Sequence, residues 1–290
     1  MLKKRLIACL LIKDDLIVQS ISFNKYLPIG NPKFPLEFLN KWDVDEIVLL
    51  DMSAYKKKRK LNLKILEVLS KSCFVPLTVG GGITNVEDVR KFIRAGADKV
   101  SINSSAIINP KLITEIADIF GSQCVVVSMD CKFDKDGVYR VYKDSGKIPT
   151  NLVASEWAKE IENLGAGEIF LNSIDRDGSK IGYDNNLIKE ITNAISLPVI
   201  ACGGVGDFSH FASGIINGGA SAVAAGNIFH YIEHSTIIAK MNLLQSGIDI
   251  RMDSEATYKG RQFDKNGRLM MMSREELSKI EFTKGKEDII

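Results

Sequence analysis

Short apolar runs alternate with longer amphipathic stretches along most of this 290-residue chain. Between the runs, apolar positions recur at helical spacing, as in residues 86–95 and 187–194. Strands that alternate with helices form parallel sheets, and eight strands can close into a barrel. We therefore predict an α/β fold, a TIM-type (β/α)8 barrel over residues 1–250 followed by a C-terminal extension over 251–290. The eight expected strands are about 5–12, 46–51, 75–80, 98–102, 123–130, 168–173, 197–201 and 221–225.

The two halves of the chain resemble each other at offsets of about 119 to 123 residues. This repeat predicts two related half-barrels of four strand–helix units each. An open doubly wound sheet is the alternative, but it would not readily produce a two-fold repeat. The matching segments are 5–13 with 124–132, 46–51 with 168–173, 79–83 with 202–206 and 96–100 with 219–223.

Three segments fall outside the pattern. Residues 13–32 read as a long loop after the first strand, at the face where barrel active sites lie, and we expect it to act as a lid. Residues 131–150 contain Phe133-Asp-Lys-Asp-Gly137 between β-type runs, which predicts a hairpin inserted after the fifth strand. The polar stretch from about residue 250 is expected to be either a docking helix or a partly disordered appendage.

Composition excludes several classes of protein. Hydrophobic residues make up 45% and charged residues 26%, and a net charge of +2 argues against a nucleic-acid surface. No apolar run approaches the ~18 residues that span a membrane, and the apolar start ends by Ile12 without a cleavage site. The odd number of cysteines lacks metal-type spacing, which favours reduced thiols in the cytoplasm. We expect no metal, no cofactor and no membrane association.

Glycine clusters follow two matching strands, at residues 80–82 and 203–204, and each precedes a helix. Glycine lets the backbone approach an anion, and a helix start offers free N–H groups. The matched pair predicts a small-molecule substrate with a phosphate at each end; the alternative is that the glycines only make tight turns. The residues expected to bind this substrate are Gly81, Gly82, Asn103, Ser104, Asn172, Asp177, Gly178, Gly203, Gly204, Ala225 and Gly226.

Asp177 and Gly178 lie in the segment 175–178, which follows the sixth strand. We expect them to cap the second anion site and to hydrogen-bond a ribose-like hydroxyl. An ordinary charged turn is an equally good interpretation from composition alone.

Together these motifs resemble the cyclase subunit of imidazole glycerol phosphate synthase over about residues 1–250. The resemblance rests on segments 79–83, 97–103, 120–123, 173–178 and 203–204. It implies a half-barrel duplication that binds a bis-phosphorylated ribonucleotide intermediate of histidine synthesis. It also implies that a separate glutaminase subunit, docked beneath the barrel, supplies ammonia. In that family, two aspartates at the ends of the first and fifth strands serve ring closure at the top face.

Four strands begin with a charge: Arg5, Glu46, Lys99 and Glu168. Alternate residues of a strand share a face, so these charges point into the barrel bottom if the strand ends line the active site. Two positive and two negative groups can pair there as a closed ring, whereas solvated strand flanks are the alternative. The resemblance implies that the ring forms the ammonia entrance, and that Asp98 lies at the glutaminase interface.

The sequence departs from the family at its catalytic pair. Asp130 matches one catalytic aspartate, but the position of its partner holds Leu11, which cannot transfer a proton. Gln19 also stands where the family has a lysine suited to holding phosphate. With the entrance and anion turns kept but the cyclase chemistry impaired, the chain resembles a paralogous group associated with sugar amidation for surface polysaccharides. That group acts with its own glutaminase and a separate sugar amidotransferase.

Two other functions remain open from the sequence. One is an authentic cyclase subunit of histidine biosynthesis, a lyase. The other is a non-catalytic scaffold that only activates the glutaminase.

Overall fold

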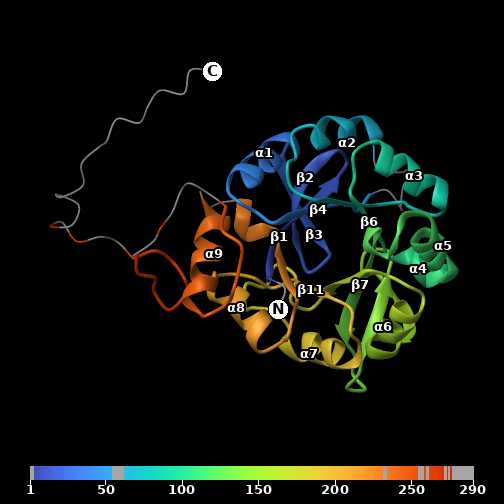
Figure 1. The fold of residues 1–290 in the computed structure, drawn as a ribbon. Coiled ribbons are helices and arrows are strands. Elements are labelled where there is room, and N and C mark those ends of the chain that lie inside the picture. The colour runs from blue at the N-terminus through green and yellow to red at the C-terminus, as the bar shows by residue number, and fades with distance from the viewer. Residues whose placement is uncertain are drawn as a thin grey trace.

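The computed structural model describes residues 3–53, 62–230, 234–253, 258, 261–270, 273 and 275. Eight parallel strands form a closed barrel in which β12 pairs with β1 and β7 pairs with β10 (Figure 1). All eight predicted strands are therefore confirmed, as is the TIM-type barrel. The strands are β1 (Arg5–Lys13), β4 (Glu46–Asp51), β5 (Leu77–Gly80), β6 (Lys99–Ile102), β7 (Val125–Phe133), β10 (Glu168–Ser173), β11 (Val199–Cys202) and β12 (Ala222–Ala225).

Helices surround the barrel, and most of them carry an apolar stripe that packs against the strands (Figure 1). In α7, for example, Leu187, Ile188 and Ile191 are buried. No helix within the described ranges is long and apolar enough to cross a membrane. The helices are α1 (Lys33–Lys41), α2 (Leu63–Ser70), α3 (Val86–Arg94), α4 (Ser104–Ile108), α5 (Lys111–Phe120), α6 (Ala154–Asn163), α7 (Asn185–Ala194), α8 (Ser209–Ile216) and α9 (Ser235–Gln245), with short 3-10 turns η1 (Ser122–Cys124) and η2 (Asn227–His230).

The strand register repeats between the two halves. In β1, Leu11 lies opposite Leu50 of β4, and in β7, Asp130 lies opposite Asn172 of β10. Both β1 and β7 also continue into antiparallel strand pairs: β2 (Leu16–Ile21) with β3 (Lys25–Gly30), and β8 (Tyr139–Lys143) with β9 (Ile148–Val153). Leu11 and Asp130 are therefore equivalent positions of two related half-barrels.

The interpretation of residues 13–32 as a long loop is wrong, because most of this segment forms the β2–β3 hairpin. Strand β3 has no buried residue, so its sequence lacks the apolar alternation that reveals a half-buried strand. The inserted hairpin at 131–150 is confirmed, and β9 extends it to Val153. Past residue 250, a bridge joins Phe263 to Leu269.

This C-terminal segment lies against α8 and α9 in its described part. The Phe208 N–H donates to the Asn266 carbonyl over 3.2 Å, and the Gln245 side chain donates to the Arg261 carbonyl over 3.0 Å. Most residues beyond 270, including Met271 and Met272, lie outside the described part of the chain. Both expected forms of this extension, a docking helix or a partly disordered appendage, therefore stay predictions.

Candidate functional site

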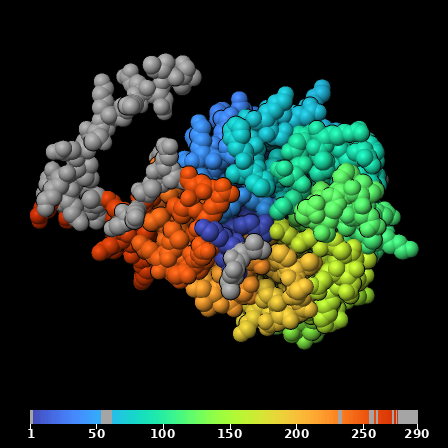
Figure 2. Space-filling view, in the orientation of Figure 1, coloured from blue at the N-terminus to red at the C-terminus, as the bar shows by residue number. Residues whose placement is uncertain are grey.

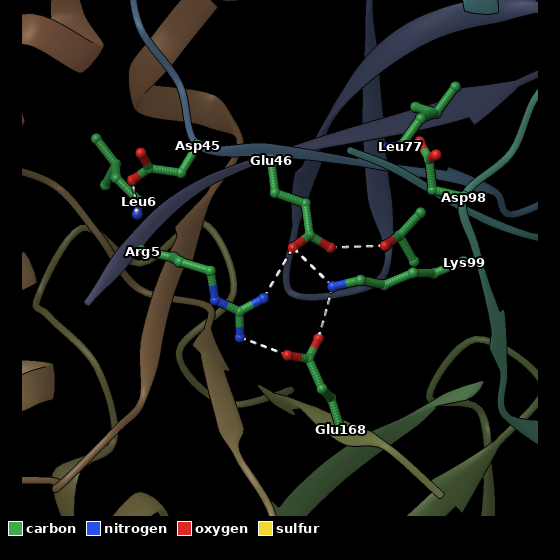
Figure 3. A network of polar contacts seen from close by, with 9 residues as sticks. Arg5, Leu6, Asp45, Glu46, Leu77, Asp98, Lys99 and Glu168 are labelled. Carbon is green, nitrogen blue, oxygen red and sulfur yellow. Dashed lines mark hydrogen bonds and ion pairs between the residues drawn. The ribbon is translucent and has the colours of Figure 1, made fainter. Parts of the chain in front are cut away.

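The four strand-start charges form a closed ring of ion pairs at the N-terminal end of the barrel (Figure 3). Arg5 lies 2.9 Å from Glu46 and 2.5 Å from Glu168. Lys99 completes the ring at 2.9 Å from Glu46 and 3.0 Å from Glu168. Each charge is thus bound to two of opposite sign, so the alternative of separately solvated strand flanks is excluded.

Sequence reasoning missed a neutral residue that hydrogen-bonds to this ring. The Thr78 hydroxyl donates to Oε1 of Glu46 over 2.6 Å, and both residues are buried. Thr78 shares its strand face with Gly80, since alternate residues point the same way, so this alternation was the available signal. The carboxylate of Glu46 is consequently hydrogen-bonded at both oxygens and is only 2% exposed. It is the most enclosed charge of the ring.

An apolar layer separates the ring from the opposite end of the barrel. Its members come from strands of both halves and form a single buried cluster. Such packing is typical of barrel interiors, which are filled by layers of inward side chains. The cluster is Ile7, Cys9, Val48, Val126, Phe170, Ile200, Ala222 and Ala224.

A cavity of about 250 Å³ opens at the C-terminal ends of the strands. Leu11 and Asp130 both line it, from strands on opposite sides of the barrel. The predicted residues Gly81, Gly82, Asn103, Ser104, Asn172 and Asp177 line it as well. Gly178, Gly203, Gly204, Ala225 and Gly226 do not. The structure therefore gathers the anion turn of the first half at this cavity, but not that of the second half.

The first-half turn depends on glycine. Gly81 and Gly82 have φ values of +129° and +71°, which side chains rarely allow. A Cβ on Gly81 would lie 2.7 Å from the Asp51 carbonyl oxygen, so the turn leaves no room for one. Across the cavity, Ser104 accepts a hydrogen bond from the Asp144 N–H over 3.0 Å, so the β8–β9 turn contacts this site. No sequence signal placed Asp144 here, because an inserted hairpin has no counterpart in the strand pattern.

The loop after β10, which holds Asp177 and Gly178, lies beneath the β2–β3 hairpin. Asp177 accepts hydrogen bonds from the Ser20 hydroxyl over 2.6 Å and from the Phe23 N–H over 3.0 Å. The Asn227 side chain donates to the Ser20 carbonyl over 2.7 Å. A Cβ on Gly178 would lie 2.7 Å from that same carbonyl oxygen. The hydroxyl that Asp177 binds here therefore belongs to the chain's own hairpin.

Asp130 is a buried carboxyl that lines the cavity. The Asn103 amide donates to its Oδ2 over 2.8 Å, and Asn172 also hydrogen-bonds to it. Burial is the main cause that raises the pKa of Asp130 to about 7, and the nearby charge of Asp177 also raises it. The hydrogen bonds from the Asn103 and Asn172 amides lower this pKa. At neutral pH this group is therefore partly protonated, as suits a group that gives and takes protons.

The raised pKa of Asp130 makes stability depend on pH. In the unfolded chain the carboxyl ionises near pH 4, whereas in the folded protein it keeps its proton to about pH 7. Its contribution to the free energy of unfolding is complete below pH 4 and is lost as the pH rises to 7. Relative to Asp130→Asn, the wild type should lose roughly 2 to 4 kcal/mol over that range. Urea unfolding of both proteins from pH 4 to 8 measures this; parallel curves would contradict it.

Comparisons with known proteins agree with this architecture. The family model described as "Histidine biosynthesis protein" matches residues 5–235. A protein of Vibrio vulnificus (strain YJ016), named provisionally as imidazole glycerol phosphate synthase subunit hisF2, is 46% identical over 270 residues. The match covers 92% of this chain and 98% of that protein. This (β/α)8 barrel therefore belongs to the histidine biosynthesis protein family and, within it, to the cyclase-type subunits of imidazole glycerol phosphate synthase.

Proposed function

We propose that this chain is the barrel subunit of a glutamine amidotransferase complex, acting in sugar amidation for surface polysaccharide. A glutaminase subunit docks beneath the barrel, and its ammonia passes the charged ring to a phosphorylated acceptor at the top face. The observation that carries this proposal is the pairing of a complete ring with a mouth that has Asp130 but Leu11 in place of a second catalytic carboxyl.

The ring suits an entrance because its four members form one closed network of ion pairs, which a docked partner can open. The apolar interior above it suits the passage of a neutral molecule, since buried charge is costly in an apolar environment. At the far end, Asp130 with its amide partners provides one group that can orient ammonia or exchange a proton.

An authentic cyclase of histidine synthesis is the second candidate, and the name of the Vibrio relative favours it. A scaffold that only activates the glutaminase is the third. Neighbouring genes for histidine enzymes support the cyclase, and genes for nucleotide-sugar enzymes support sugar amidation. Ammonia-dependent turnover by the isolated chain would exclude the scaffold.

Docking of a glutaminase is tested at Asp98, which is exposed at the same end of the barrel as the ring. Its Oδ2 accepts a hydrogen bond from the Leu77 N–H over 2.8 Å. Asp98→Ala should weaken the complex or its stimulation of glutamine hydrolysis, in binding and hydrolysis assays with a co-expressed glutaminase subunit. Asp98→Asn is the matched control because its amide oxygen can still accept from Leu77, while the charge is lost.

A defect in both Asp98 variants indicates that the charge contacts the partner. If only the alanine variant is impaired, the hydrogen bond to Leu77 matters and Asp98 is no interface charge. Failure to recover any glutamine-hydrolysing subunit, under conditions that preserve weak complexes, would contradict the proposed function.

Anion binding is tested by melting temperature. Inorganic phosphate and ribulose 1,5-bisphosphate should both raise it, because a ligand at a hundred times its Kd stabilises the native state by about 2.7 kcal/mol. Ser104, which lines the cavity, and Asn227 are equivalent positions of the two halves. Ser104→Asp should abolish protection by phosphate, whereas Asn227→Asp should remove only the additional protection given by the bis-phosphate. No shift with either ligand would refute phosphate binding at both turns.

A further inference from the structure

The residues just before Glu46 and Lys99 hold their neighbouring strands in the same way (Figure 3). Asp45 accepts a hydrogen bond from the Leu6 N–H over 2.7 Å, and its own N–H donates to the Leu6 carbonyl over 3.0 Å. Asp98 does the same with Leu77, at 2.8 and 2.9 Å. Each aspartate therefore clamps the adjacent strand beside a member of the charged ring.

The two clamps differ in what lies behind them. Asp98 is exposed, whereas the side chain of Asp45 is only 8% exposed. Behind Asp45 lies Lys240 of α9, whose side chain has no exposed surface. Its Nζ is 2.7 Å from Oδ1 of Asp45 and 3.4 Å from Oδ2 of Asp43. A fully buried lysine is rare without such partners, because desolvating its charge is costly.

Through Asp43, Lys240 connects the Asp45 clamp to the segment that follows α9. Asp43 adopts a left-handed backbone conformation with φ of +62°, which is uncommon for a non-glycine residue. Its Oδ2 also accepts a hydrogen bond from the Asp253 N–H over 3.1 Å. Helix α9 lies between α8 and α1 in Figure 1, and the first described residues, in dark blue, lie near the middle of the face shown in Figure 2. The lysine thus joins the last helix to the strand starts around that centre.

We infer that Lys240 is a positioning residue for the charged ring, holding the Asp45 clamp so that Arg5 and Glu46 meet. Leu6 follows Arg5 and Asp45 precedes Glu46, so the clamp fixes β1 against β4 directly beside the 2.9 Å pair between Arg5 and Glu46. Burial raises the pKa of Asp45, and the charge of Lys240 counteracts this increase. The inference rests on the proposed function only for the statement that the ring admits ammonia.

The two clamps provide an internal comparison in the purified full-length chain. In Lys240→Met, amide hydrogen exchange at Leu6 should accelerate by roughly tenfold, the equivalent of losing one hydrogen bond to a charged group. Exchange at Leu77 should stay at the wild-type rate, because Asp98 does not contact Lys240. Equal acceleration at both amides would show global destabilisation and overturn the positioning role, as would an unchanged rate at Leu6.

One further variant covers the case in which Lys240→Met fails to fold, and a second one serves as a control. The double variant Asp45→Asn, Lys240→Met leaves no buried charge at this pair, and the amide oxygen can still accept from Leu6. It should restore slow exchange at Leu6; fast exchange there with a native melting curve would overturn the charge-compensation argument. Lys159→Met removes a lysine from an exposed ion pair with Glu156 and should change neither amide.

Glutamine hydrolysis in the complex separates this inference from the proposed function. If wild-type barrel stimulates a co-expressed glutaminase, Lys240→Met should reduce that stimulation while phosphate still protects the chain against heat. Full stimulation by a folded Lys240→Met would overturn the inference and leave the proposed function intact. If the wild type finds no glutaminase, the proposed function fails, and the exchange rates at Leu6 and Leu77 still decide the positioning role.

Discussion

A bacterium that lacks its own cyclase subunit should remain dependent on added histidine when it receives this chain and its glutaminase. The reason is Leu11, which lines the mouth cavity at the position equivalent to Asp130. The family's ring closure uses a carboxyl at each of these positions, and proton transfer by one positioned group typically contributes 10² to 10⁴ in rate. Asp130 alone cannot readily serve as both acid and base in one closed site.

The variant Leu11→Asp should restore some growth without histidine. Recovery is expected to be incomplete, because Gln19 of β2 replaces the lysine that the family uses for phosphate. Leu50→Asp is the matched control: Leu50 lies opposite Leu11 in the next strand and lines the same cavity, so it also adds a carboxyl there. If the position of the added carboxyl matters and not merely its charge, only Leu11→Asp should restore growth without histidine. Robust growth with the unmodified chain would return this protein to the histidine pathway.

The barrel could be predicted from the sequence because it depends on periodicity, whereas periodicity only permitted the ring and the family resemblance favoured it over solvated strand flanks. Alternation along each strand places Arg5 and Glu46 on the inner face, and the structure joins them at 2.9 Å. The internal repeat likewise makes Leu11 and Asp130 equivalent, and the two strand registers agree with it. These features follow from local pattern and need no knowledge of how distant segments pack.

The features that could not be predicted from the sequence depend on tertiary contacts between segments distant in sequence. The cover over the loop after β10 arises because Ser20 reaches Asp177 and Asn227, which only the folded barrel brings together. Lys240 lies 195 positions from Asp45, in a helix that is buried on nearly every side. Periodicity cannot identify the partner of such a lysine, because its helix has no clear polar face.

Replacing Glu46 should have the largest effect on stability among the ring residues. Its carboxylate contacts Arg5, Lys99 and Thr78 at once. Glu46→Gln leaves both cations with only Glu168, and breaking a fully buried ion pair typically costs about 3 to 5 kcal/mol. Solvent reduces this cost, because the side chains of Arg5 and Lys99 are 27% and 17% exposed. Urea unfolding at pH 7 should therefore show a loss of about 2 kcal/mol.

The control for this loss is Glu156→Gln, which removes the carboxylate of an exposed ion pair with Lys159 and should cost less than about 1 kcal/mol. In the double variant Glu46→Gln, Lys99→Met, one cation and one anion disappear together, and Arg5 keeps Glu168 at 2.5 Å. Because no uncompensated charge then remains at the barrel bottom, the double variant should be more stable than Glu46→Gln alone. A double variant whose loss equals the sum of the two single losses would show that the four charges act independently. The ring would then be a set of separate contacts, with no closed network for a docked glutaminase to open.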